Sequence, residues 1–116
     1  MNCHNGALFS DNKFHNNGFA GDDKGLYSVT HNDDDLGKMK TPSLRDVMKT
    51  KPWMHDGSFD EIKMIIEKYD SGSVSGSTDK LIKPLHLSLK EKHDLAAFLK
   101  AISAVPLVFK KPTMPD

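Results

Sequence analysis

Residues 1–40 constrain the fold most, because this long stretch carries almost no periodic pattern of apolar side chains. It is rich in Asn, Asp, Gly and His, as the run FSDNKFHNNGFAGDDKGLYSVTHNDDDLGK over residues 9–38 illustrates. The longest strand-like pattern is GLYSVT at residues 25–30. Irregular segments of this length are usually functional or disordered, and a partner is needed to hold them in place. The sequence therefore predicts a loop-rich fold.

Two helices are predicted in the middle of the chain. Thr41 or Ser43 can cap a short helix that runs to about Lys49 and is ended by Pro52. A second helix is predicted from about residue 59 to residue 69, because its apolar residues recur at the spacing of one helical face. The residues of this face are Ile62, Ile65, Ile66 and Tyr69.

The last helix has the clearest signals. Ser88 and Glu91 form a capping box, in which each side chain can satisfy a free amide at the helix start. The buried stripe is predicted to consist of Leu95, Phe98, Leu99 and Ile102. The run SGSVSGSTDK at residues 71–80 predicts a flexible loop, and residues 106–116 a loose tail. The fold class is therefore mostly α, with three to four short helices and long loops in one domain over residues 1–105.

Composition excludes several classes of function. The chain has 116 residues, with 16 basic and 16 acidic side chains, so its net charge of zero argues against nucleic-acid binding. No apolar run reaches the length of a membrane span, and no signal peptide is visible in the first residues. The single cysteine, Cys3, excludes an internal disulfide.

Cys3 and His4 form a dipeptide that matches the second half of C-x-x-C-H, the attachment motif of c-type haem. In that motif the thiols bond to the haem vinyl groups, and the adjacent histidine is the proximal iron ligand. The alternatives are a free thiol beside a surface histidine, or a nucleophilic Cys–His pair. Adjacent residues rarely present both side chains to one substrate, which disfavours the nucleophilic pair.

Four segments in order resemble the C-terminal haem domain of bacterial di-haem cytochrome c peroxidases and their MauG-like relatives. They are CHNGALFSDNKFHNNGF, KTPSLRDV, PWMHDGSFDEI and KEKHDLAAFLKAIS, and together they extend over nearly the whole chain. The resemblance implies a cytochrome c-like fold around a haem. It also implies an upstream cysteine directly before Met1 and an N-terminal haem domain. We therefore expect this chain to be a fragment that starts inside its C-x-x-C-H motif.

The resemblance also implies a haem ligand set. His4 would be the proximal ligand, Cys3 one of two attachment points, and Tyr69 the distal ligand, at the family's spacing after the H-D-G motif that contains His55. Tyr69 also lies in the middle of its helix's apolar face, so it can point into a buried site. The alternatives are that Tyr69 is only a core aromatic residue, or that a methionine is the ligand. The candidate methionines are Met48, Met54 and Met64, of which Met64 falls on the opposite face of the helix.

Three further residues gain roles from the resemblance. It places His55 near the haem and the inter-domain contact, as a group for hydrogen bonding and for electron or proton transfer. Arg45 would pair with a haem propionate, because its planar fork matches a carboxylate. Trp53 would pack on the porphyrin, on the absent domain or in the core.

The family holds a calcium ion between its two domains through backbone oxygens of a T-x-P segment, which Thr50 and Pro52 match here. Another ligand would come from the absent domain, so a stable calcium site in this chain alone is not expected.

The implied function is a haem domain that takes electrons from a small donor protein, of the cytochrome c or cupredoxin type, in the periplasm. It would pass them to a second haem that reduces hydrogen peroxide. One alternative is a MauG-like enzyme that oxidises another protein. The others are a mono-haem electron-transfer module without catalysis, or a haem-free fragment without activity. This chain alone is expected to have little peroxidase activity, because the peroxide-binding haem belongs to the absent domain.

Overall fold

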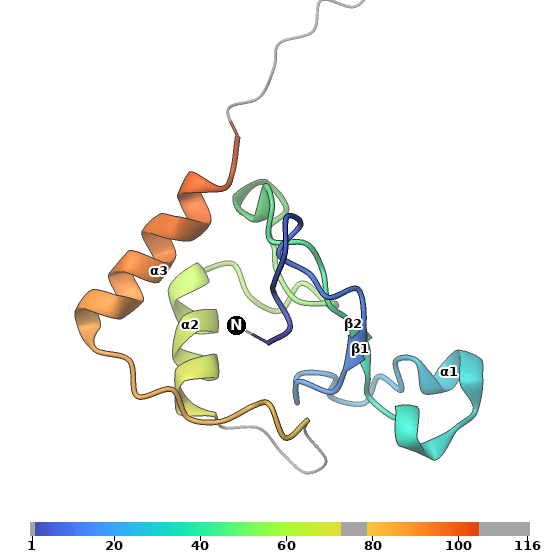
Figure 1. The fold of residues 1–116 in the computed structure, drawn as a ribbon. Helices are drawn as coiled ribbons and strands as arrows, with labels where there is room; N and C mark the ends of the chain where they lie inside the picture. Colours follow the sequence, from blue (N-terminus) through green and yellow to red (C-terminus); the bar gives the residue numbers. More distant parts are fainter. Residues whose placement is uncertain (1, 73–78, 105–116) are drawn as a thin grey trace, which may run out of the picture.

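The computed structural model describes residues 2–72 and 79–104 (Figure 1). Along the chain it contains β1 (Phe14–His15), α1 (Tyr27–Thr30), the 3-10 turn η1 (Asp33–Asp35), β2 (Met39–Lys40), the 3-10 turn η2 (Val47–Lys49), α2 (Ile62–Ser71) and α3 (Leu89–Ala101). The fold is therefore rich in loops and mainly helical, with one small sheet. The predicted tail and most of the predicted 71–80 loop lie outside the described residues.

The two long helices, α2 and α3, lie side by side (Figure 1). The capping box predicted for α3 is confirmed, because Ser88 Oγ accepts from the Glu91 amide and the Glu91 carboxylate accepts from the Ser88 amide. Lys92 of α3 reaches across to α2, where its Nζ lies 2.7 Å from both a Glu67 and an Asp70 carboxylate oxygen. These contacts fix the helix pair that supports the rest of the chain.

The core between these elements is thin. Only Trp53, Ile66 and Leu99 are buried apolar residues in the described part of the chain, and none of its side chains is completely enclosed. The predicted helix faces are nevertheless correct, since Ile66 and Leu99 are the most buried members of their stripes and Met64 is 49% exposed on the opposite face of α2.

Residues 25–30, the longest strand-like pattern in the sequence, do not form a strand. This segment instead contains α1, a single helical turn, after Gly25 approaches the Lys38 backbone so closely that a Cβ would collide with the Lys38 carbonyl. The actual strands are β1 and β2, an antiparallel pair with Phe14 opposite Lys40. Each strand has two residues, too few to show an alternating pattern in the sequence.

The short helix predicted up to Lys49 is reduced to the turn η2. Ser43 Oγ accepts from the Arg45 amide, as a capping side chain would, and also donates to the Leu8 carbonyl, but no helix follows it. Asp46 adopts a left-handed conformation (φ 59°), which interrupts helical geometry directly before η2. The side chain with the best capping chemistry is thus used in a long-range contact.

Helix α2 begins three residues later than predicted. Phe59 is not helical, because it forms an antiparallel bridge with Trp53 in which the Trp53 amide donates to the Phe59 carbonyl at 2.6 Å. Gly72, with φ of 58°, ends the helix in the left-handed conformation that suits glycine. None of the described helices combines the length and apolar character required to cross a bilayer.

Replacing Leu99 by Ala is expected to destabilise the fold by about 2–5 kcal/mol, because it leaves a cavity in a core with few members. Leu89 in the same helix is 79% exposed, so Leu89→Ala is the matched control and should change stability by less than about 0.5 kcal/mol. Urea unfolding followed by circular dichroism measures both. Equal effects of the two substitutions would contradict the placement of the core on this face.

Candidate functional site

Cys3 and His4 lie in a compact loop that closes on itself over residues 3–11. The Asp11 amide donates to the Cys3 carbonyl at 2.8 Å, and the Ser10 amide donates to the Asn5 carbonyl at 2.9 Å. Gly6 permits the tight turn inside the loop, because it adopts φ of 66°. The loop therefore presents Cys3 and His4 from a defined backbone.

The His4 ring is oriented by one hydrogen bond. Its Nδ1 lies 2.8 Å from the Phe9 carbonyl oxygen. A carbonyl can only accept, so Nδ1 carries the proton, and the Nε2 of the neutral ring keeps its lone pair. In the described part of the chain His4 makes no other hydrogen bond, which leaves Nε2 free to bind a metal. This is the arrangement by which proteins orient metal-binding histidines.

Contacts with the segment after β2 fasten this loop to the rest of the molecule. Ser10 Oγ donates to the Thr41 carbonyl at 2.8 Å, and both residues are buried. From the other side, Arg45 Nε donates to the Ala7 carbonyl at 2.6 Å, and its guanidinium lies 5.5 Å from the centre of the Phe9 ring. Arg45 thus holds the Cys–His loop here, and its pairing with a haem propionate stays a prediction.

Tyr69 lies near the end of α2, and its phenol oxygen accepts a hydrogen bond from Asn17 Nδ2 at 3.1 Å. Its ring packs against Phe19, with 5.3 Å between the ring centres. Burial is the main cause that raises the pKa of the Tyr69 phenol, the Asn17 bond acts in the opposite direction, and the charge of Cys3 raises the pKa further. Tyr69 is thus a largely buried phenol whose oxygen has a defined hydrogen-bond donor in Asn17.

His15 bridges two carboxylates beside Cys3. Its Nε2 lies 2.7 Å from Asp11 and its Nδ1 lies 2.7 Å from Asp79. Both carboxylates accept, so both ring nitrogens carry protons, and these bonds raise the pKa of His15. The pKa of Asp11 is lowered to about 2, mainly by the hydrogen bond from the Lys13 amide and then by the bond from His15. Burial, followed by the charges of Asp11 and Asp79, raises the pKa of the Cys3 thiol. Potential ligand atoms of Cys3, Asp11 and His15 lie within 4.8 Å of one another.

Comparison with known proteins identifies the family. The chain is 38% identical to the cytochrome-c peroxidase IdrP1 of Pseudomonas sp. (strain SCT), over 99% of this chain and 39% of that protein. It is 34% identical to the methylamine utilization protein MauG of Methylophilus methylotrophus, over 98% of this chain and 35% of that protein. No family model matches the chain.

The chain belongs to the cytochrome c peroxidase and MauG family. A solved crystal structure agrees: a MauG-like protein associated with microbial copper homeostasis superposes with a TM-score of 0.78 and 29% identity, over 88% of this chain and 41% of that one. The chain spans about two fifths of the length of these relatives.

Membership of this family implies a c-type haem, and the donor chemistry of the site fits one. A thiol next to an imidazole with a free Nε2 suits covalent attachment and proximal ligation. The Tyr69 phenol oxygen, which comes from a separate element, could supply a second ligand to the iron. The thin core also suits a cytochrome, in which a large apolar ring buries surface that the side chains leave open.

The structure keeps the other predicted peroxidase-family residues apart from this cluster. His55 lies at the tip of the turn joining Trp53 to Phe59, with its Nε2 3.7 Å from an Asp23 carboxylate oxygen. Thr50 and Pro52 are exposed. Trp53 is a core residue whose Nε1 donates to the Val47 carbonyl at 2.7 Å. The roles of His55, Thr50 and Pro52 remain predictions.

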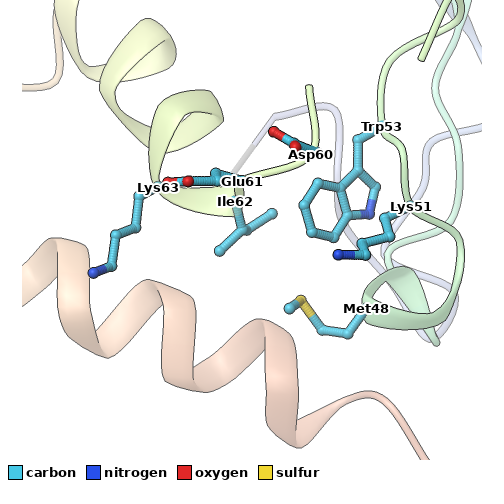
Figure 2. Close-up of a pocket in the computed structure, with 7 residues that line it drawn as sticks. All are labelled: Met48, Lys51, Trp53, Asp60, Glu61, Ile62 and Lys63. Atoms are coloured by element: carbon cyan, nitrogen blue, oxygen red, sulfur yellow. The ribbon is translucent and has the colours of Figure 1, made fainter. Parts of the chain in front are cut away.

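A groove lies beside Trp53, at the start of α2 (Figure 2). Met48 and Ile62 point toward the indole, and charged side chains of both signs form the rim (Figure 2). The seven lining residues are Met48, Lys51, Trp53, Asp60, Glu61, Ile62 and Lys63. Cys3, His4, Arg45 and Tyr69 do not line this groove, whereas Met48, an alternative distal ligand, and Trp53 do.

Sequence reasoning assigned no role to His15 and did not consider Asn17. His15 and Asp79 are 64 positions apart, and Asn17 and Tyr69 are 52 apart. No local spacing reveals such pairs. The only available signal was the concentration of His, Asn and Asp in residues 11–17, which fits a solvated loop equally well.

The bridge through His15 predicts a pH-dependent stability. The pKa of His15 is raised above its ordinary 6.5, so its contribution is complete below about pH 6.5 and is lost as pH rises through the raised value. The pKa values of Asp11 and Asp79 are lowered from 3.8, so their contribution is complete above about pH 4 and is lost as pH falls through the lowered values.

Urea unfolding should therefore show a larger loss of stability between about pH 5.5 and about pH 9 in the parent chain than in His15→Gln. His93 is an exposed histidine of α3, and His93→Gln is the matched control that should retain the loss. If His15→Gln showed the same pH dependence as the parent chain, the imidazolium bridge would not stabilise the fold.

Proposed function

We propose that this chain is a c-type haem domain that relays electrons within a di-haem cytochrome c peroxidase. Its His4 would be the proximal iron ligand, Cys3 an attachment point and Tyr69 the distal ligand. The observation that carries the proposal is the His4 ring, held through Nδ1 beside the only cysteine with its Nε2 free.

The bound haem would supply one-electron chemistry at its iron. The Phe9 carbonyl would orient His4 and increase its basicity as a ligand. Tyr69 as a phenolate would stabilise the higher iron charge and so lower the reduction potential relative to a methionine ligand. Arg45 would keep the attachment loop in place and His55 would serve electron or proton transfer at the inter-domain contact.

The remaining chemistry belongs to a longer protein, because the chain spans about two fifths of its relatives. A reduced donor protein in the periplasm, of the cytochrome c or cupredoxin type, would give up two electrons in total. This chain would pass them to a second haem, where hydrogen peroxide takes up the two electrons and two protons and yields two waters. The isolated chain is expected to reduce peroxide poorly.

A MauG-like function, oxidation of another protein, is the second candidate. Two observations favour it: the solved structure that resembles this chain is a MauG-like protein, and the candidate distal ligand is a tyrosine. A protein substrate would replace the small donor as the source of electrons for peroxide. The two candidates differ in whether the whole protein consumes reduced donor or oxidises a target protein.

Calcium is a subsidiary part of the proposal. The backbone oxygens of Thr50 and Pro52 would be two of its ligands, and other ligands would come from outside this chain. Because Thr50 and Pro52 are exposed, they are accessible to a second domain.

Expressed together with c-type haem attachment machinery, the chain should carry covalent haem, seen as a Soret band and a protein mass raised by one haem. Cys3→Ser should remove the mass increase, because the thiol forms the thioether bond. His93→Gln is the control for a histidine away from the site and should retain it. A haem mass that persisted in Cys3→Ser would contradict the assignment of Cys3.

Tyr69→Phe should raise the reduction potential and change the visible spectrum of the oxidised haem protein, because an anionic oxygen ligand is lost. Met64→Leu is the matched control in the same helix, since Met64 is 49% exposed on the opposite face. If Met54→Leu changed the spectrum and Tyr69→Phe did not, the distal ligand would be a methionine.

A further inference from the structure

The amide of Asn17 has a defined orientation toward Tyr69. Its Oδ1 accepts a hydrogen bond from the Phe19 amide at 3.2 Å. The Nδ2 group therefore faces the Tyr69 oxygen, 3.1 Å away, and donates to it. Since Nδ2 has no lone pair to offer, the Tyr69 oxygen must act as the acceptor in this pair.

The two residues before Asn17 are held in place by contacts to Asp79. His15 donates to the Asp79 carboxylate at 2.7 Å, and the Asp79 amide donates to the Asn16 carbonyl at 2.8 Å. Two consecutive residues before Asn17 are thus bonded to one residue that comes after α2 in the chain. On the other side, the Phe19 ring lies 5.3 Å from the Tyr69 ring. The donor and the acceptor are each fixed by separate contacts.

We propose that Asn17 is a positioning residue that donates a hydrogen bond to the iron-binding oxygen of Tyr69 and thereby raises the reduction potential of the haem. This inference rests on the proposed function, in which Tyr69 is the distal ligand. A hydrogen bond withdraws electron density from a phenolate oxygen, so the oxygen stabilises oxidised iron less strongly.

The surroundings of Tyr69 explain why such a donor is needed. A phenolate oxygen is stabilised by an N–H group aimed at it, and Asn17 Nδ2 is such a donor at 3.1 Å. If the ligand were a methionine, Asn17 could donate only a weak hydrogen bond to it, because a thioether sulfur is a weak acceptor that carries no charge. The donor is therefore matched to a phenolate ligand and not to a thioether.

The test is the midpoint potential of the haem-loaded chain in Asn17→Leu, a substitution of similar size without a donor. Without the donor, the phenolate should stabilise oxidised haem more strongly relative to reduced haem. At a fixed potential the ratio of oxidised to reduced haem should then rise about tenfold, which corresponds to about 59 mV toward lower potential.

Asn16→Leu is the matched control. Asn16 is the adjacent residue, and its side chain also makes two hydrogen bonds, to the Leu36 carbonyl and from the Gly18 amide, but none to Tyr69. It should leave the potential unchanged even if it lowers stability. In a Tyr69→Phe background, Asn17→Leu should also have no effect on the potential, since its acceptor is gone.

The outcomes test separately whether Tyr69 is the distal ligand and whether Asn17 tunes the potential through it. A shift in Asn17→Leu that disappears in the Tyr69→Phe background supports the role of Asn17. If Tyr69→Phe shifts the potential and Asn17→Leu does not, or if Asn16→Leu shifts it equally, the role of Asn17 is overturned and the ligand assignment stands. If Tyr69→Phe leaves the potential unchanged, the ligand assignment fails, and the inference fails with it.

Discussion

The buried hydrogen bond from Ser10 to the Thr41 carbonyl is the contact on which the site depends most. It joins the Cys–His loop to the segment after β2, across 31 positions of sequence. The same hydroxyl accepts from the Asn12 amide, and the Thr41 amide donates to the Lys13 carbonyl, so this junction also begins the strand pair. Because both residues are buried, loss of either partner would leave an unsatisfied polar group inside a thin core.

The parts of the fold that sequence reasoning predicted correctly depend on local chemistry. The capping box at Ser88 and the apolar stripes of α2 and α3 need only neighbours three or four residues away, and they are correct in the structure. The Cys3–His4 pair and Tyr69 could also be selected from the sequence, the first by a dipeptide motif and the second by its place on a helical face. Their roles as haem ligands are proposals on that basis.

The parts that sequence reasoning missed depend on contacts between distant residues. Ser43 accepts from the Arg45 amide as a helix cap does, yet Asp46, whose amide donates to the distant Ile102 carbonyl, is left-handed, and the predicted helix becomes the turn η2. The strands β1 and β2 are fixed by the junction at Thr41 and not by an alternating pattern. The bridge through His15 needs Asp79, whose position depends on where α2 ends. The helix and strand propensities of single residues could not predict this turn, this strand pair or this bridge, because each depends on tertiary contacts.

Because the core is thin, the polar contacts around the candidate site also contribute to the stability of the fold. Cys3, His4 and Tyr69 come from a loop and a helix that share few buried apolar contacts, so polar contacts from residues 10–17 and 41–45 hold them together. A substitution in these segments therefore changes stability and haem environment at once. A reduction potential separates the two effects better than an activity does, since it responds to the charge balance at the iron and not to the fraction of folded protein. For this reason the partnership of Asn17 and Tyr69 is best judged from a double-mutant cycle in potential.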